Sequence, residues 1–210
     1  MRRDALLVAL TFASGSVDAV AFLRLDALTA VMTGNLVLLG VAVGRGAMAS
    51  ALRSLVALCG YAGGVVVGAR VAGHGPSEIS SPRIVRAFTL EWGLQAAFLL
   101  GWMATRSAPE GAAAAALIGV SGLVMGIQAA TVQALGSRIS TTYVTSTLTN
   151  LVRDLTSVSG LGPDAHRHAA AVLALVAGAI AGALVLVTVP VAAPAVPLAV
   201  IGMVLALSRR

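Results

Sequence analysis

Long apolar runs separated by short polar stretches dominate the pattern along this chain of 210 residues. A membrane-spanning helix needs about 20 mostly apolar residues. By that measure the pattern predicts helices over residues 5–23, 52–71, 84–105, 112–135 and 169–189, and a shorter one over 195–207. Pro190, Pro194 and Pro197 separate the last two, because proline lacks the N–H that a helix interior needs.

Two further segments, residues 28–43 and 143–158, are apolar but short, and polar near their start. The first contains Thr33-Gly34-Asn35 and the second contains Thr145-Ser146-Thr147. Irregular backbone at membrane depth occurs only where it is buried in protein or lines a wet cavity. The pattern is therefore typical of re-entrant or broken helices, or of full helices that face a polar interior.

These two segments belong to an internal repeat. Asp18 precedes Thr33 by 15 residues, and Gln128 precedes Thr145 by 17. A run with small residues at every fourth position follows each segment: Gly60, Gly64 and Gly68 in one half, and Ala174, Gly178 and Gly182 in the other. We therefore predict two structural repeats, residues 1–105 and 112–208. Paired interrupted segments in transporter-like folds mark a binding site between the halves.

Composition agrees with a membrane protein. Hydrophobic residues make up 58% of the chain and charged residues 10%, and the mean hydropathy is +0.95. So few charges cannot cover a soluble domain of this size, and the alternating segments of a transmembrane β-barrel are missing. The predicted fold is an all-α polytopic transmembrane helix bundle with about six spans and two short interrupted or re-entrant helices.

The net charge of +6 comes from arginine, since the chain has no lysine. The arginines are scattered and form no basic face, so nucleic-acid binding is not expected; they act as topology determinants. If the interrupted segments do not cross, six spans put ten arginines inside and four outside. If both cross, eight spans give nine against five. Both arrangements place both termini in the cytoplasm, with inverted halves in the first and parallel halves in the second.

Asp18 is the first candidate for chemistry, because a carboxylate at the centre of a transmembrane helix costs about 2.5–3.5 kcal/mol. It could bind a cation, carry a proton, or donate a hydrogen bond as the neutral acid. The structural alternative is a carboxyl that bonds a neighbouring helix or pairs with Arg24. Its counterpart in the second half, Gln128, is neutral.

Glu91 is the second acidic candidate, and Gln95 lies one turn further on the same helix face. The alternative for Glu91 is an interfacial carboxylate paired to Arg86. The hydroxyls, amide and accessible backbone of the interrupted segments could contact a solute or ion, or else cap and join helices. The candidates for substrate or ion binding are Asp18, Thr33, Gly34, Asn35, Glu91, Gln128, Thr145 and Thr147.

No catalytic or cofactor motif is present in the sequence. Asp164, His166 and His168 lie close together, but His166 and His168 point to different faces of a helix and a metal needs convergent ligands. Cys59 is alone, so no disulfide forms within the chain. We predict no enzyme activity, no metal and no cofactor.

Four motifs in order resemble the YoaK-like family of bacterial membrane proteins of unknown function. They are Gly15-Ser16-Val17-Asp18-Ala19, Met32-Thr33-Gly34-Asn35-Leu36, Gly126-Ile127-Gln128-Ala129 and Val144-Thr145-Ser146-Thr147-Leu148-Thr149. The resemblance implies a bacterial inner-membrane protein with about six spans, and no established substrate. Ser146 stands where the family usually has glycine.

The leading hypothesis is a small-solute or ion transporter whose site lies between the two repeats. One alternative is a membrane-embedded enzyme acting on a lipid or quinone, which needs a second acid or base close to Asp18. Another is a non-catalytic membrane assembly subunit. The expected partners are the lipid bilayer and a small solute or ion, and the small size is compatible with a homodimer through a row such as Gly93, Ala97 and Gly101.

Cysteine labelling decides whether the interrupted segments cross. In a Cys59→Ser background, we expect Gly46→Cys to react with an impermeant thiol reagent on intact cells and Gly160→Cys to react only in opened cells. This outcome makes the halves inverted. If neither cysteine reacts on intact cells while both react in opened cells, the chain has eight spans with parallel halves.

Overall fold

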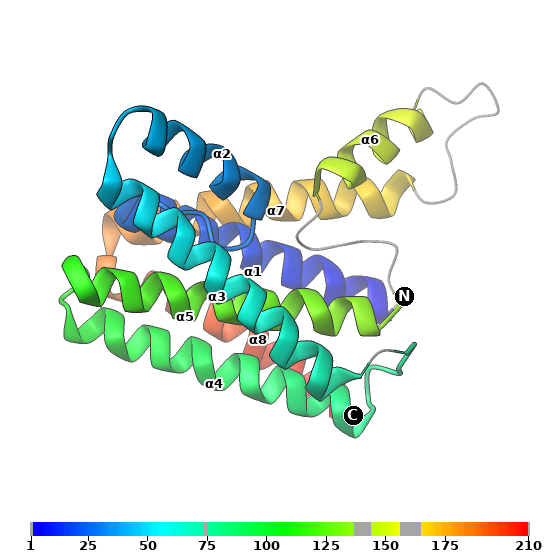
Figure 1. Cartoon of the computed structure of the whole chain (residues 1–210). Coiled ribbons are helices and arrows are strands. Elements are labelled where there is room, and N and C mark those ends of the chain that lie inside the picture. The colour runs from blue at the N-terminus through cyan, green and yellow to red at the C-terminus, as the bar shows by residue number, and fades with distance from the viewer. Residues whose placement is uncertain (1, 74, 137–143, 156–164, 210) are drawn as a thin grey trace.

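The computed structural model describes residues 2–73, 75–136, 144–155 and 165–209, and every regular element in these ranges is helical. The elements are α1 (Arg2–Leu25), α2 (Met32–Gly44), α3 (Met48–Ala72), α4 (Pro82–Ala104), α5 (Gly111–Ala134), α6 (Val144–Leu155), α7 (Ala165–Thr188), the 3-10 turn η1 (Pro190–Ala192) and α8 (Ala195–Ser208). The all-α helical bundle predicted from the hydrophobic pattern is confirmed (Figure 1).

Within the described ranges, five helical stretches are long and apolar enough to cross a membrane: α1, α3, α5, α7 and the stretch Pro190–Ser208. Helix α4 has 23 residues, which is also enough to span. Its buried Glu91 and Gln95, together with Arg83 and Arg86 near its start, lower its hydropathy.

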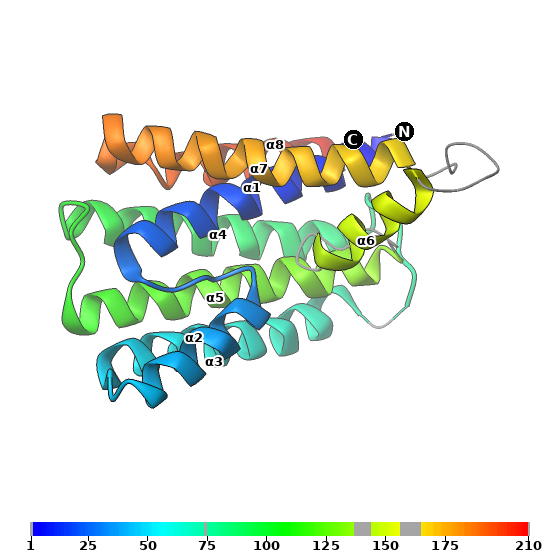
Figure 2. The same ribbon diagram turned by 90° about the horizontal axis from the view of Figure 1, so that it is seen from above.

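The long helices lie side by side, and the start of α1 and the end of α8 lie at the same end of the bundle (Figures 1 and 2). We call this the terminal end. The short helices α2 and α6 differ from the rest, because each begins near the middle of the bundle and runs outward to one end. Helix α2 runs to the end opposite the termini, and α6 runs to the terminal end (Figure 2).

The polar motif of the first interrupted segment lies at the start of a continuous helix. Thr33-Gly34-Asn35 occupies the first turn of α2, and the non-helical chain is the stretch 26–31 before it. This stretch runs back along α5 toward the middle of the bundle (Figure 2). The second polar motif likewise lies in the first turn of α6.

Glycine brings two pairs of helices into backbone contact. Between α3 and α5, a Cβ placed on Gly60 would lie 2.5 Å from the carbonyl oxygen of Gly119, and one on Gly64 would collide with the carbonyl of Leu123. Between α1 and α7, a Cβ on Gly178 would collide with the carbonyl of Phe12, and one on Gly182 would lie 2.7 Å from that of Ser16. The two predicted small-residue rows are therefore the surfaces on which α3 and α7 pack.

Large side chains then close the bundle around α4 at two levels. Near the terminal end, Phe88 packs in a buried cluster with Leu10 and Val132. At the opposite end, Trp102 packs with Val20 and Ile118, and its indole N–H donates to the carbonyl of Pro190 at 2.9 Å. Helix α4 is thus held against α1, α5 and the last hairpin, and its buried face is fixed.

Replacing a glycine at the α1–α7 contact by alanine adds one methyl group and tests how closely the two helices approach. We expect Gly178→Ala to lower the free energy of unfolding by about 1–3 kcal/mol, because overpacking forces α1 and α7 apart. The matched control is Gly93→Ala, where a Cβ meets nothing within 4 Å and helix propensity favours alanine by about 0.5–1 kcal/mol. Reversible unfolding of both variants in detergent measures the difference. Equal stabilities would show that the α1–α7 contact is not close.

Candidate functional site

Asp18 binds the stretch of chain that follows its own helix. Its Oδ1 accepts the backbone N–H of Thr29 at 2.6 Å and that of Ala30 at 2.8 Å, and the Thr29 hydroxyl lies 3.4 Å away. The carboxyl is buried. Two backbone donors in a non-helical segment would otherwise lack partners at membrane depth. The sequence left open a structural role and a chemical role for Asp18, and this geometry gives it the structural one.

Asn35 holds the same stretch from the other side. Its Oδ1 accepts the N–H of Leu28 at 3.1 Å, and its amide nitrogen donates to the carbonyl of Leu28. The side chain is fully buried. Gly34 lies under the Leu28 side chain, whereas Thr33 is exposed on the outer side of α2. Asp18 and Asn35 are therefore brought together on one segment, and Thr33 is not.

Helix α5 completes a polar seam along α1. The Ser121 hydroxyl donates to the Thr29 hydroxyl oxygen at 2.9 Å. One turn from Asp18 along α1, the amide of Gln128 donates to the Ser14 hydroxyl at 2.8 Å and to the carbonyl of Leu10 at 3.4 Å. Gln128 thus joins α1 to α5 in the bundle interior, where buried polar groups need such partners.

Glu91 is in a different position from the other candidates. Its side chain is 0% exposed, and neither carboxyl oxygen has a hydrogen-bond partner among the residues that the structure describes. The predicted alternative, an interfacial pair with Arg86, is wrong: Arg86 is exposed, and the described residues contain no ion pair between the two. Because side chains five residues apart on a helix point in different directions, the Arg86 guanidinium lies away from the buried face.

The packing around α4 places Glu91 level with the polar seam. One turn toward the terminal end, Phe88 packs with Leu10 and Val132. One turn the other way, Leu94 packs on a cluster that contains Val17 and Met125. Glu91 therefore lies between the levels of these two clusters, in the part of the bundle that contains Ser14 of α1 and Gln128 of α5.

Gln95 extends the buried polar face of α4 by one turn. It is 1% exposed, and its side-chain oxygen has no partner within the described ranges. It lines a small cavity of about 10 Å³ with Val17 and Phe98 and with Pro194 and Pro197 of the last hairpin. That volume is close to the minimum for one water molecule.

The second polar motif is only partly described. Thr147 is buried, whereas the side chain of Thr145 lies outside the described residues. Asp164 also lies outside them, and among the residues that are described no group of three or more His, Cys, Asp or Glu could hold a metal. Ser14, Thr29 and Ser121 were not among the site residues predicted from the sequence. A signal was present for Ser14, which lies one helical turn before Asp18.

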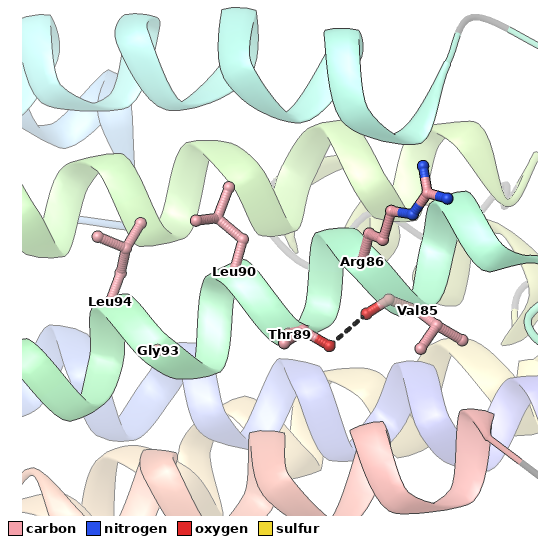
Figure 3. Close-up of a pocket in the computed structure, with 6 residues that line it drawn as sticks. All are labelled: Val85, Arg86, Thr89, Leu90, Gly93 and Leu94. Atoms are coloured by element: carbon pink, nitrogen blue, oxygen red, sulfur yellow. Dashed lines mark hydrogen bonds between the residues drawn. The ribbon is translucent and has the colours of Figure 1, made fainter.

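An open groove on α4 lies away from this interior. Its volume is about 490 Å³, and its lining residues are Val85, Arg86, Thr89, Leu90, Gly93 and Leu94 (Figure 3). At 100° per residue, the centre of this row is on the opposite side of the helix from Glu91. The groove is therefore a feature of the outer surface, and the polar interior is the candidate site.

The apolar helices and the buried polar seam define a multi-pass helical membrane protein. The family model described as "Protein of unknown function (DUF1275)" matches residues 6–207, and the chain belongs to this family. Over 156 residues it is 34% identical to the UPF0700 transmembrane protein YoaK of Bacillus subtilis (strain 168), an alignment that covers 73% of this chain and 67% of that protein. The resemblance to the YoaK-like family is thus confirmed. No solved structure matches the chain.

The anchoring of the stretch 26–31 generates a stability prediction. We expect Asp18→Asn to lower the free energy of unfolding by about 2–3 kcal/mol, because bonds from two backbone N–H groups to a carboxylate are replaced by weaker bonds to an amide. The matched control is Asp26→Asn, an exposed partner of Arg53 at 2.5 Å, which should change stability little. Equal effects of the two variants in a detergent unfolding assay would contradict the structural role of Asp18.

Proposed function

We propose that this protein is a small secondary transporter or permease for a solute or ion, with its site between two structural halves, residues 1–105 and 112–208. The first half contains α1 to α4 and the second contains α5 to α8. The polar seam between α1 and α5, with Glu91 at its level, forms the interior site.

Corresponding helices of the two halves make corresponding contacts, and this supports two related repeats. Helix α1 packs on α7, and its counterpart α5 packs on α3. Helix α2 packs on α3, as α6 packs on α7. Helix α4 packs on α5, as α8 packs on α1. Each of these three contacts has a partner with the halves interchanged, as expected from a two-fold axis that passes between α1 and α5; the packing of α3 on α4 is an exception, since α7 and α8 are not packed in the same way.

The observation that carries the proposal is the direction of the two short helices. Each has a polar first turn near the middle of the bundle, and α2 and α6 run outward to opposite ends (Figure 2). Half-helices that enter from opposite sides and meet near the midplane are typical of inverted-repeat transporters, where their ends bind the solute or the coupling ion.

The distribution of arginine supports an orientation. Helix ends at the terminal end carry Arg3, Arg70, Arg83, Arg86, Arg153, Arg167 and Arg209, and those at the opposite end carry Arg24, Arg45, Arg53 and Arg106. Arginine-rich ends face the cytoplasm. In our proposal the protein lies in the bacterial inner membrane with both termini cytoplasmic, and the halves are inverted.

The hydrogen bonds of the seam indicate what moves. Gln128–Ser14 and Ser121–Thr29 each join one half to the other. In contrast, the bonds from Asp18 and Asn35 to the stretch 26–31 lie within the first half. The close backbone contacts of α1 with α7 and of α3 with α5 also join the two halves, so in this proposal α1 and α7 move together against α3 and α5. This movement breaks the two bonds of the seam and leaves the Asp18 and Asn35 bonds intact.

Thiol access to the seam tests the proposal without knowledge of the solute. In a Cys59→Ser background, we expect Ser14→Cys to react with a small impermeant thiol reagent both on intact cells and on inside-out vesicles. The reaction should be slower than that of the surface controls, which are Gly46→Cys on intact cells and Gly160→Cys on inside-out vesicles. The reason is that an interior site alternates in access between the two sides. Ser121→Cys provides a second position in case the loss of the Ser14–Gln128 bond perturbs the fold.

A purely structural bundle predicts another result. If Ser14→Cys and Ser121→Cys react only after denaturation, from neither side of the folded protein, the interior does not open and the transport proposal is wrong.

A further inference from the structure

We propose that Glu91 is the proton-binding residue of this protein: it holds a proton in the closed conformation seen here and releases it to water when the interior opens. The inference deepens the proposed transport function and rests on it, and it names the coupling ion of that site. It starts from a carboxyl nine residues into α4, about 14 Å from the helix start, with no exposed surface.

The two buried acids of the described bundle differ in the donors that reach them. Oδ1 of Asp18 receives two backbone N–H donors at 2.6 and 2.8 Å, which stabilise a carboxylate, whereas its Oδ2 has no partner among the described residues. Glu91 receives none from the described residues. An ionised carboxylate without donors in an apolar interior is far more costly than the neutral acid. When two acids lie in contrasting environments, one can remain a carboxylate while the other holds a proton, and proteins use this difference to give the two residues different roles.

The helices packed around α4 supply no counter-charge at this depth. Helices α5 and α8 have no ionisable side chain within their bounds. Helix α3 has Arg53 and Arg70 near its two ends, with Tyr61 and the exposed Cys59 between them. On α1, the ionisable groups are Asp18 in the interior, Asp4 and two arginines at the start, and Arg24 at the other end. Glu91 therefore shares the interior with one other acid and with no base.

A proton fits this place better than a metal ion. Hard cations such as Ca²⁺ and Mg²⁺ take six or more oxygen ligands, and within the described ranges no cluster of three or more His, Cys, Asp or Glu surrounds Glu91. The neighbouring cavity, at about 10 Å³, is near the lower limit for a single water molecule. A proton needs no further room, because it is carried on the carboxyl oxygen itself.

In this proposal the proton leaves through the cavity beside Gln95, which lies one turn along α4 from Glu91. When the interior opens and water enters, the O–H bond of the Glu91 carboxylic acid breaks and the proton bonds to a water molecule, which leaves a carboxylate and a hydronium ion. No electron is transferred. Gln95 is a positioning residue in this step, since its amide lies one turn from Glu91 and borders the cavity.

Infrared spectroscopy of the purified full-length protein in liposomes tests the inference. At neutral pH we expect a C=O stretching band of a protonated carboxyl that disappears in Glu91→Gln and stays in Glu110→Gln, an exposed glutamate at the start of α5. Glu91→Asp keeps an acid on α4 and should keep a band at a shifted frequency. On transfer to D₂O the wild-type band should shift, because the proton exchanges with water.

Three outcomes overturn the inference. They are the absence of the band in the wild type, its persistence in Glu91→Gln, and a band assigned to Glu91 that never shifts in D₂O, which would mark a sealed structural acid. Thiol access at Ser14 separates the two proposals. If Ser14→Cys labels from both sides but the band persists in Glu91→Gln, the protein opens as proposed and the proton is bound elsewhere. If neither Ser14→Cys nor Ser121→Cys labels in the folded protein, the transport proposal is wrong, and the release step fails with it.

Discussion

Backbone contact between helices is the constraint on which the rest of this structure depends. No hydrophobic force draws apolar helices together in lipid, so association relies on close packing and on polar bonds. Here the close packing is concentrated in two pairs, α1 with α7 and α3 with α5, where glycines face carbonyl oxygens of the partner helix. Because α3 and α7 hold α5 and α1 from outside, the polar sides of α1 and α5 are turned toward one another. Helices α4 and α8 then close the interior with large side chains, and this places Glu91 beside the seam.

The polar side chains enclosed by this packing divide into two kinds. Asp18, Asn35, Ser121 and Gln128 have hydrogen-bond partners at named backbone or hydroxyl groups, and most of these bonds hold the non-helical stretch before α2. Such bonds are obligatory, since irregular backbone cannot lie unpaired at membrane depth. Glu91 and Gln95 are as deeply buried, but neither carboxyl oxygen of Glu91 nor the side-chain oxygen of Gln95 has a partner in the described part of the chain, whereas Asp18 has donors on Oδ1 and lacks a partner only on Oδ2. Bonds of the first kind explain how the fold tolerates the non-helical stretch 26–31 among its helices. Burying polar groups of the second kind without partners costs free energy, and the packing of the helices does not require these groups. We therefore connect them with function.

Much of the fold could be predicted from the hydrophobic pattern, because helix length and apolar content are local properties. The six long helices lie within a few residues of the predicted segments, and the two short helices occur at the polar interrupted segments. The rows at Gly60 and Gly178 are packing surfaces, as small residues spaced by four predicted. The error concerned Glu91. Its distance from the arginines along the chain indicated an interfacial pair with Arg86, but sequence spacing does not say which side of α4 faces the bundle. Three large buried side chains, Phe88, Phe98 and Trp102, fix that side.

The sequence by itself determined that this is a multi-pass helical membrane protein with a polar motif in each half, and it identified Asp18, Asn35, Glu91 and Gln128 as the side chains that need explanation. It did so because the cost of a charge or an amide in lipid can be judged one residue at a time. Only the tertiary structure decided what each of them meets. Asp18 bonds to Thr29 and Ala30 after a reversal of the chain, Gln128 bonds to Ser14 across 114 positions, and Glu91 meets no donor in the described bundle. Partners of this kind depend on which helices pack together and at what rotation, and that is set by side chains far apart in the sequence.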